Sequence, residues 1–587
     1  MNWSDGRLFE YLRKAVLGSF VIALACGLLL PIYSDEVGWR LQERAWLDGV
    51  DKVYSDQCGP NTLAVPPAFM WPVRWYSAFF NTHFPDPFFV RLSGVAYAML
   101  WIWMVIRLIC RTGRNPADRH VLVVIAAALM GLGVTPLLLV WSRPEQPILL
   151  AVTAALVTAS AGWRSPGNLF GPFAGIDYDT APASLGTAWW RSFSILALGL
   201  IALSYHFKAV LLVPVFGAAI LYASRGRRTL PIRLLALVLL AWGSLASAQY
   251  WVARLDCPGD PLIAKAHAHE NLAGELAVGS ASVLTVAGEV LGNYRLHKYV
   301  DLAAPLVAPM SQWLPYNRVS DDEMHGWQGG MAAIWALALA AGIASVGLTA
   351  RTAWRERRLP PEPVMAVLLF GAVSIWCVSQ LTRHVYEVTF ILPLTMLAIV
   401  LALSAPHRND RLRQSAAVLA LAIGPLMMIS QLLIAGYYGG PLLSAAQSRG
   451  YIKGQTWSVP VFGYGSSRRD LRSLAQACGL PAPDQASNLL IDDTTYFAFM
   501  ESRLPQHQLA VLAPKLHGSI SDPLAYLRSR HSSGIILGCQ WLPRELRHRA
   551  HMRGSFCCLA PRDWDAPSTS AQATPPARAT GTAASAN

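Results

Sequence analysis

The sequence predicts a polytopic α-helical membrane protein of about eleven spans, followed by a small extracytoplasmic α/β domain. Three observations support this fold class. The 587 residues are 53% hydrophobic and only 14% charged, whereas soluble domains carry about 25% charged residues. Apolar runs of nearly membrane-spanning length recur between residues 15 and 435. Beyond residue 435, short strand-like runs alternate with helix-like stretches.

Each expected span is close to the ~20 residues that cross ~30 Å of hydrocarbon. The first follows Arg7, Arg13 and Lys14 and stays apolar as far as Pro31, which favours a retained helix over a cleaved signal peptide. The expected spans are residues 15–33, 88–106, 120–141, 147–163, 189–206, 209–224, 232–252, 329–350, 362–381, 386–405 and 414–435.

Arginine-rich loops indicate how these spans are oriented. With the N-terminus in the cytoplasm, the inner loops carry most of the arginines, as the positive-inside rule requires. The loop after residue 163 is longer and partly acidic. The net charge of +13 is therefore an orientation signal spread over short loops, and we exclude a nucleic-acid partner. The inner-loop arginines are Arg107, Arg111, Arg114, Arg119, Arg225, Arg227, Arg228, Arg233, Arg351, Arg355, Arg357, Arg358, Arg408, Arg411 and Arg413.

An odd number of spans places the C-terminal region outside, in a multi-pass protein of a bacterial inner membrane. We expect a transmembrane domain over 1–435 with outer loops 34–87 and 253–328, an α/β domain over 436–565, and a disordered Ser/Thr/Ala/Pro-rich tail over 566–587. The strand candidates are "NLLIDD", "LAVLAP", "GIILGCQWL" and "SFCCLA", and the helix candidate is "RRDLRSLAQACGL".

Six cysteines fall outside the cytoplasm in this topology, where an oxidising compartment permits disulfides. The sequence does not choose among their pairings, although Cys58 and Cys257 offer an attractive bridge between the two outer loops. No Cys/His spacing resembles a zinc site. The six are Cys58, Cys257, Cys478, Cys539, Cys557 and Cys558.

Polar residues of chemically useful types gather at four outer turns. Each group also has a purely structural explanation. Acids are favourable at a helix start, an exposed ion pair contributes little to stability, a lysine can extend its ammonium to the membrane surface, and an arginine can bind lipid headgroups. However, all of them face one side of the membrane at a similar depth. The residues are Asp35 and Glu36 after the first span, Arg143 and Glu145 after the third, His206 and Lys208 after the fifth, and Arg383, His384 and Tyr386 after the ninth.

Such a set suits the transfer of a group from a lipid phosphate. A carboxylate can deprotonate an acceptor hydroxyl within hydrogen-bond reach. Lysine and arginine can stabilise a phosphate, more strongly in a partly dry site. A sugar carried on a phosphate already has a good leaving group, so a single base suffices, unlike glycoside hydrolysis with its two carboxyl groups. We therefore expect a transferase that uses a lipid-linked donor.

Four segments resemble the multi-span GT-C-fold glycosyltransferases, which use polyprenyl-phosphate-linked sugars. The likeness is to the branch of lipid A aminoarabinose transferases and protein O-mannosyltransferases. "SDEVGWRLQERAW" is similar to the family's first-loop acidic motif with its interfacial helix, and "SRPEQPILL" to its Arg-Pro-acid turn. "YHFKAVLLVPVFGAAIL" resembles the Lys-Gly-Pro segment, with Ala209 in place of the glycine, and "TRHVYEVTFILPLTMLAIV" the Arg…Tyr…Pro pattern.

The resemblance implies a GT-C-like domain that inverts the sugar. Asp35 would be the base, supported by Glu36, and Arg143 with Glu145 would position sugar or acceptor. Lys208 would contact the donor phosphate together with Arg383. Tyr386, and with it His206 and His384, would complete the substrate site. The acceptor hydroxyl would belong to a lipid, a glycan or a protein. No cofactor is required; some relatives use a divalent metal, but no ligand set here requires one.

Two alternatives remain open. An O-antigen ligase or polymerase also uses lipid-linked sugars at the outer face, and the loop 253–328 with His267, His269 and Glu270 keeps it under consideration. A transporter is a different class, and it would place its polar groups near the membrane midplane on broken helices of repeated halves. The sequence shows no such repeat.

Overall fold

The computed structural model describes the helical part of the chain and parts of the C-terminal region. The described residues are 6–31, 87–113, 115–133, 135–163, 184–224, 226–255, 282, 284–285, 288, 321–356, 360–379, 387–404, 410–447, 461–481, 489–491, 495, 506–508, 528, 531–539, 542, 544–554 and 556–564. They divide into two compact units, Met1–Ser467 and Arg468–Asn587.

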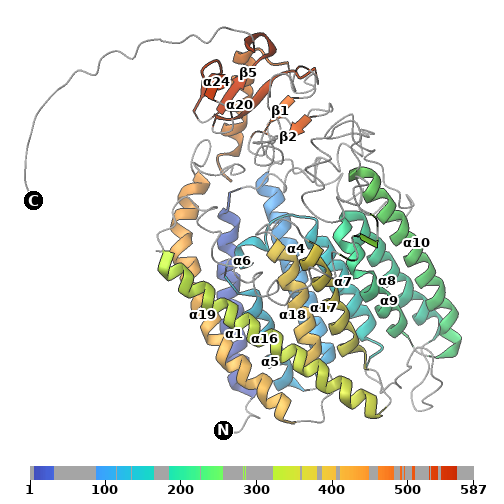
Figure 1. Ribbon diagram of the computed structural model, residues 1–587. Coiled ribbons are helices and arrows are strands. Elements are labelled where there is room, and N and C mark those ends of the chain that lie inside the picture. Colours follow the sequence, from blue (N-terminus) through green and yellow to red (C-terminus); the bar gives the residue numbers. More distant parts are fainter. Residues whose placement is uncertain are drawn as a thin grey trace, which may run out of the picture. The chain divides into compact units, whose positions relative to one another are not determined.

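Every expected span overlaps at least one helix of the first unit (Figure 1). Within the described residues, six regions are long and apolar enough to cross a membrane, and four further apolar helices are shorter. The predicted polytopic helical architecture is therefore confirmed. The helices are α1 (Gly6–Cys26), α4 (Pro87–Thr112), α5 (Pro116–Met130), α7 (Glu145–Ser160), α8 (Leu185–Tyr205), α9 (Val213–Tyr222), α10 (Leu230–Leu255), α16 (Asp321–Glu356), α17 (Pro361–Ser379), α18 (Val388–Ser404) and α19 (Asp410–Gln447).

Helix α18 forms the centre of the bundle. Nearly every residue of α18 is buried, and it packs against α16, α17, α5 and α7. A helix that is apolar on all sides can be buried in this way. Other helices of the first unit instead expose large apolar side chains, such as Trp190 on α8, Val238 on α10 and Ile343 on α16. Such side chains suit contact with lipid tails, so the outer helices separate α18 from the membrane.

The helices depart from the expected spans at three places. The third span is interrupted, because α5 ends at Met130 and the short α6 (Thr135–Leu138) follows Gly133, which has a φ of 52°. The last two residues of "YHFK" begin a 3₁₀ helix, η2 (Phe207–Leu212), so Lys208 lies within a helical turn. Helix α19 continues to Gln447, beyond the expected end of the last span at residue 435.

The arginine-rich helix ends lie together at one end of the bundle. Arg413 at the start of α19 forms an ion pair of 2.9 Å with Asp118 at the start of α5. Arg111 near the end of α4 donates to the carbonyl of Val157 near the end of α7. Arg191 of α8 donates to the carbonyl of Ala223, just after α9. These contacts agree with the common inner side that the positive-inside pattern predicts.

The second unit contains a five-stranded sheet in the order β2-β1-β3-β5-β4. Strand β1 is parallel to β2 and β3, and β5 is antiparallel to β3 and β4. The expected small α/β fold is thus present. The strand candidate "LAVLAP" and residues 566–587 lie outside the described residues. The predicted domain boundaries at residues 435 and 565 stay predictions. The elements are α20 (Tyr464–Cys478), β1 (Leu489–Ile491), β2 (Gln506–Gln508), β3 (Ile535–Gly538), α24 (Arg544–Arg547), β4 (His551–Arg553) and β5 (Phe556–Leu559).

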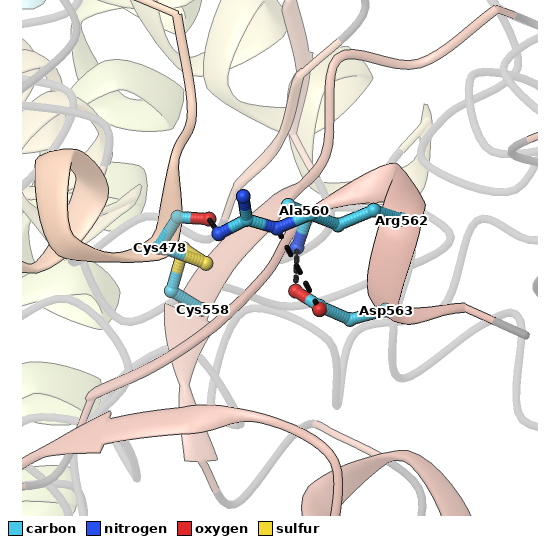
Figure 2. Close-up of a disulfide and its surroundings, with 5 residues drawn as sticks. All are labelled: Cys478, Cys558, Ala560, Arg562 and Asp563. Carbon is cyan, nitrogen blue, oxygen red and sulfur yellow. Dashed lines mark hydrogen bonds and ion pairs between the residues drawn. A yellow bond between two sulfur atoms is a disulfide. The ribbon is translucent and has the colours of Figure 1, made fainter. Parts of the chain in front are cut away.

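Two disulfides connect β5 to its neighbours. Cys557 pairs with Cys539, which follows β3, and Cys558 pairs with Cys478 at the end of α20. Because adjacent strand residues point to opposite faces, the two bonds leave β5 on opposite sides of the sheet. Figure 2 shows Arg562 beside the second bond, donating to the Cys478 carbonyl at 3.1 Å. Cys58 and Cys257, the possible bridge between the two outer loops, lie outside the described residues.

Candidate functional site

The site begins with the loop that leads into α7. The Arg143 guanidinium donates to both carboxylate oxygens of Glu145, with Nε to Oε2 at 3.1 Å and a terminal nitrogen to Oε1 at 3.4 Å. Glu145 is the first residue of α7 and follows Pro144, so its charge lies at the positive end of the helix. The two side chains are only 4% and 1% exposed. This burial excludes the explanation of an exposed ion pair of little energetic value.

Lys208 joins this pair to another part of the chain. His206 ends α8 in an extended conformation, and its Nδ1 accepts a hydrogen bond from the Lys208 backbone N–H at 3.2 Å. Helix η2 begins there and directs the Lys208 side chain to Glu145, with Nζ 2.6 Å from Oε1. The Lys208 side chain is 3% exposed, so it does not extend to water as a snorkelling lysine does.

Glu387 adds a second carboxylate from the residue just before α18. Its Oε1 and Oε2 lie 3.1 and 3.2 Å from Lys208 Nζ. The Trp376 indole of α17 donates to Glu387 Oε2 at 2.7 Å, and its ring centroid lies 4.8 Å from Lys208 Nζ. The Phe390 ring of α18 lies 5.7 Å from the same nitrogen. Lys208 therefore contacts two carboxylates and two aromatic rings.

We call Arg143, Glu145, Lys208 and Glu387 the ion cluster. It contains two positive and two negative side chains, so its formal charge is zero when all are ionised. Such balance is needed because an unpaired charge in this buried setting would be costly. The two carboxylates hold the Lys208 side chain at a fixed position. The cluster thus presents ordered donors and acceptors at the end of the bundle opposite the arginine-rich ends.

The structure brings together polar residues of three expected outer turns. Glu145 of the third turn and Lys208 of the fifth are in contact, and Lys208 meets the start of α18 after the ninth turn. His206 lies beside Lys208. The remaining candidates, which are Asp35, Glu36, Arg383, His384 and Tyr386, lie outside the described residues, as do His267, His269 and Glu270 of the ligase alternative. Their roles stay predictions.

Sequence reasoning missed Glu387 and Trp376. Glu387 directly follows Tyr386 in "TRHVYEVTF", so an acid at a span boundary was a visible signal. Trp376 lies inside an apolar span, where its indole counts as apolar, and no signal marked its hydrogen bond to Glu387. Among the described residues, no group of three or more His, Cys, Asp or Glu side chains could hold a metal ion.

Comparison with known proteins finds similar solved structures. The crystal structure of ArnT from Cupriavidus metallidurans bound to undecaprenyl phosphate is 13% identical, with a TM-score of 0.39 over 94% of this chain and 98% of that one. The archaeal oligosaccharyltransferase AglB from Archaeoglobus fulgidus, in complex with an inhibitory peptide and a dolichol-phosphate, is 12% identical, with a TM-score of 0.40 over 89% of this chain and 69% of that one. No family model and no curated protein matches the sequence.

Proposed function

We propose that the chain is a membrane glycosyltransferase that moves a sugar from a polyprenyl-phosphate donor to an acceptor hydroxyl at the outer face of the membrane. The observation that carries the proposal is the contact of Lys208 with Glu145 and Glu387, which are 63 and 179 residues away in sequence. Three separate turns, which we predict to be outer, therefore meet at one buried charged site, as a shared active site requires. A transporter site would lie near the membrane midplane, whereas this cluster lies at helix ends.

In this mechanism, Asp35 removes the proton of the acceptor hydroxyl, whose oxygen then attacks the anomeric carbon. The bond between that carbon and the phosphate oxygen breaks, and polyprenyl phosphate leaves with inversion at the sugar. Lys208 and Arg383 stabilise the departing phosphate. A donor phosphate that reaches Lys208 competes with Glu145 and Glu387 for the lysine ammonium. The phosphate displaces Glu387, whose contacts with Lys208 are longer, more easily than Glu145, which lies 2.6 Å from it.

Two observations support an outward-facing site. The arginine-rich helix ends lie at the end of the bundle opposite the ion cluster, which favours a cytoplasmic location for the former. The C-terminal unit contains two disulfides, which form and persist in oxidising compartments. By contrast, the described cysteines without a disulfide, Cys26, Cys110 and Cys377, all belong to helices of the bundle. An extracytoplasmic C-terminal unit accounts for this division.

The proposal is tested by donor consumption in membranes. Membranes with the wild-type chain are incubated with undecaprenyl-phosphate-linked hexoses and pentoses that carry a radiolabel on the sugar, and the lipid-soluble label is followed. We expect the wild type to transfer label to an acceptor, and Asp35→Asn to abolish transfer without loss of folded protein. Asp118→Asn is the matched control, because Asp118 is a part-exposed carboxylate at the arginine-rich end. No transfer by the wild type from any donor would refute the proposal, and full activity of Asp35→Asn would refute its assigned base.

A further inference from the structure

A buried arginine holds the end of the first helix. Helix α1 ends at Cys26 and continues as a 3₁₀ turn, η1 (Gly27–Leu29). The last carbonyls of a helix lack partners within it. One terminal nitrogen of Arg91, from α4, lies 2.9 Å from the carbonyl oxygens of both Gly27 and Leu30, and the other lies 3.2 Å from that of Pro31. Arg91 thus binds three carbonyls across 60 residues of sequence or more.

The choice of arginine at this position has a physical reason. Arg91 is completely buried within an apolar helix, where a charge is expensive unless polar groups surround it. The negative end of the α1 dipole and three carbonyl oxygens supply that environment. The planar fork of a guanidinium offers two terminal nitrogens that reach separate acceptors at once, whereas lysine has a single nitrogen. The side chain therefore fixes both the position and the direction of the chain as it leaves α1.

The same part of α4 packs on the loop that carries the ion cluster. The hydroxyls of Ser93 and Ser142 lie 3.5 Å apart, and Gln146 donates to the carbonyl of Gly94 at 3.0 Å. Gly94 has no room for a Cβ, because the backbone of Val140 lies against it. Gly27 likewise has no room for a Cβ, because the backbone of Leu137 lies against it. The start of α4 therefore connects the end of α1 to the loop that holds Arg143 and Glu145.

We propose that Arg91 is a positioning residue for the transfer reaction. It fixes, relative to the ion cluster, the end of α1 from which the segment with Asp35 and Glu36 starts. This inference rests on the proposed function. Asp35 follows Pro31 by four residues, so even a fully extended chain separates their Cα atoms by at most about 14 Å. The anchored end of α1 therefore limits where Asp35 can act.

Arg233 provides a matched control. It is also a buried arginine, 1% exposed, whose terminal nitrogens donate to the carbonyls of Leu221 at 2.9 Å and Gly226 at 3.1 Å. These acceptors lie at the end of α9 that is remote from Lys208. About 13 helical residues separate Lys208 from Leu221, which corresponds to roughly 20 Å. Arg91 and Arg233 thus make the same kind of contact, one beside the candidate site and one far from it.

The test compares Arg91→Lys with Arg233→Lys in the full-length protein. Each change keeps the positive charge but removes the fork. Purified variants are assayed for kcat and KM with the radiolabelled undecaprenyl-phosphate sugar that the wild type consumes, normalised to folded protein. We expect Arg91→Lys to lower kcat at least about tenfold with little change in KM for the donor, since a displacement of about 1 Å at a reacting group can cost about 100-fold. We expect Arg233→Lys to leave kcat unchanged.

Hydrogen–deuterium exchange supplies a readout that does not depend on activity. We expect the peptide covering residues 27–36 to exchange faster in Arg91→Lys and to be unchanged in Arg233→Lys. The inference would be overturned if this peptide exchanged in Arg91→Lys at the wild-type rate. It would also be overturned if the peptide exchanged faster while kcat stayed unchanged, or if kcat fell equally in both variants. If the wild type transfers no sugar, the proposed function fails, and the role of Arg91 in positioning a transfer reaction fails with it. Hydrogen–deuterium exchange then still decides whether Arg91 holds the end of α1.

Discussion

Replacing Lys208 by methionine removes the positive charge that joins Glu145 to Glu387. The side chains of Lys208, Glu145 and Glu387 are 3%, 1% and 8% exposed, so the change leaves a buried carboxylate without its cation. Removing one partner of a buried ion pair costs about 3–5 kcal/mol. The lost cation–π contact with Trp376, at 4.8 Å, adds up to about 2 kcal/mol. We expect Lys208→Met to lower the free energy of unfolding by about 4 kcal/mol or more.

A second substitution separates charge balance from packing. Adding Glu387→Gln to Lys208→Met leaves only Arg143 and Glu145 charged, so the remaining cluster is neutral again. The new amide oxygen can still accept the hydrogen bond from Trp376. We therefore expect the double variant to be more stable than Lys208→Met, by about 2 kcal/mol, because residues of one network are not additive.

The measurement is the thermal midpoint of detergent-solubilised protein, followed by the loss of the monodisperse folded species. The matched control is Lys14→Met, because Lys14 pairs with Glu10 at 2.8 Å while both side chains are 60% and 42% exposed. That exposed pair contributes at most about 1 kcal/mol. The reasoning would be refuted if Lys208→Met were no less stable than Lys14→Met, or if Glu387→Gln lowered the midpoint of Lys208→Met further.

Two further predictions concern the aromatic partner and the disulfides. Trp376→Phe keeps a ring beside Lys208 but removes the N–H donor to Glu387, so we expect a loss of about 1.5–3 kcal/mol and reduced transfer; unchanged thermal midpoint and turnover would contradict this. The Cys478–Cys558 bond closes 80 residues and the Cys539–Cys557 bond 18, which in the chain-entropy model contribute roughly 4.5 and roughly 3 kcal/mol. Limited proteolysis should show a larger destabilisation when both Cys478 and Cys558 are replaced by alanine than when both Cys539 and Cys557 are. The reverse order would rule out this entropic account.

The helical architecture could be predicted because membrane spans are local signals. Apolar length and arginine-rich ends are both visible along the chain, and the bundle follows them, including Pro393 inside α18. The break between α5 and α6 was missed because residues 121–134 form an uninterrupted apolar run, although Gly131 and Gly133 stand at that break. Hydropathy reports the length of an apolar segment and does not report where its helix is interrupted.

The site was only partly predictable, for a related reason. Arg143, Glu145, His206 and Lys208 were found because they interrupt apolar runs at the expected outer ends. Their partners follow from three-dimensional packing, which no local pattern reveals. Arg91 did carry a signal, since a charge a few residues inside an apolar span is expensive and therefore functional by default. What it binds, the carbonyls at the end of α1, became visible only in the structure.

The most direct test of convergence at one transfer site is an experimental structure of the full chain with undecaprenyl phosphate bound. The account predicts the phosphate within hydrogen-bond distance of Lys208, beside Glu145 and Glu387, and the Asp35 carboxylate facing that phosphate. A phosphate bound away from the ion cluster, or Asp35 at the arginine-rich end of the bundle, would contradict it.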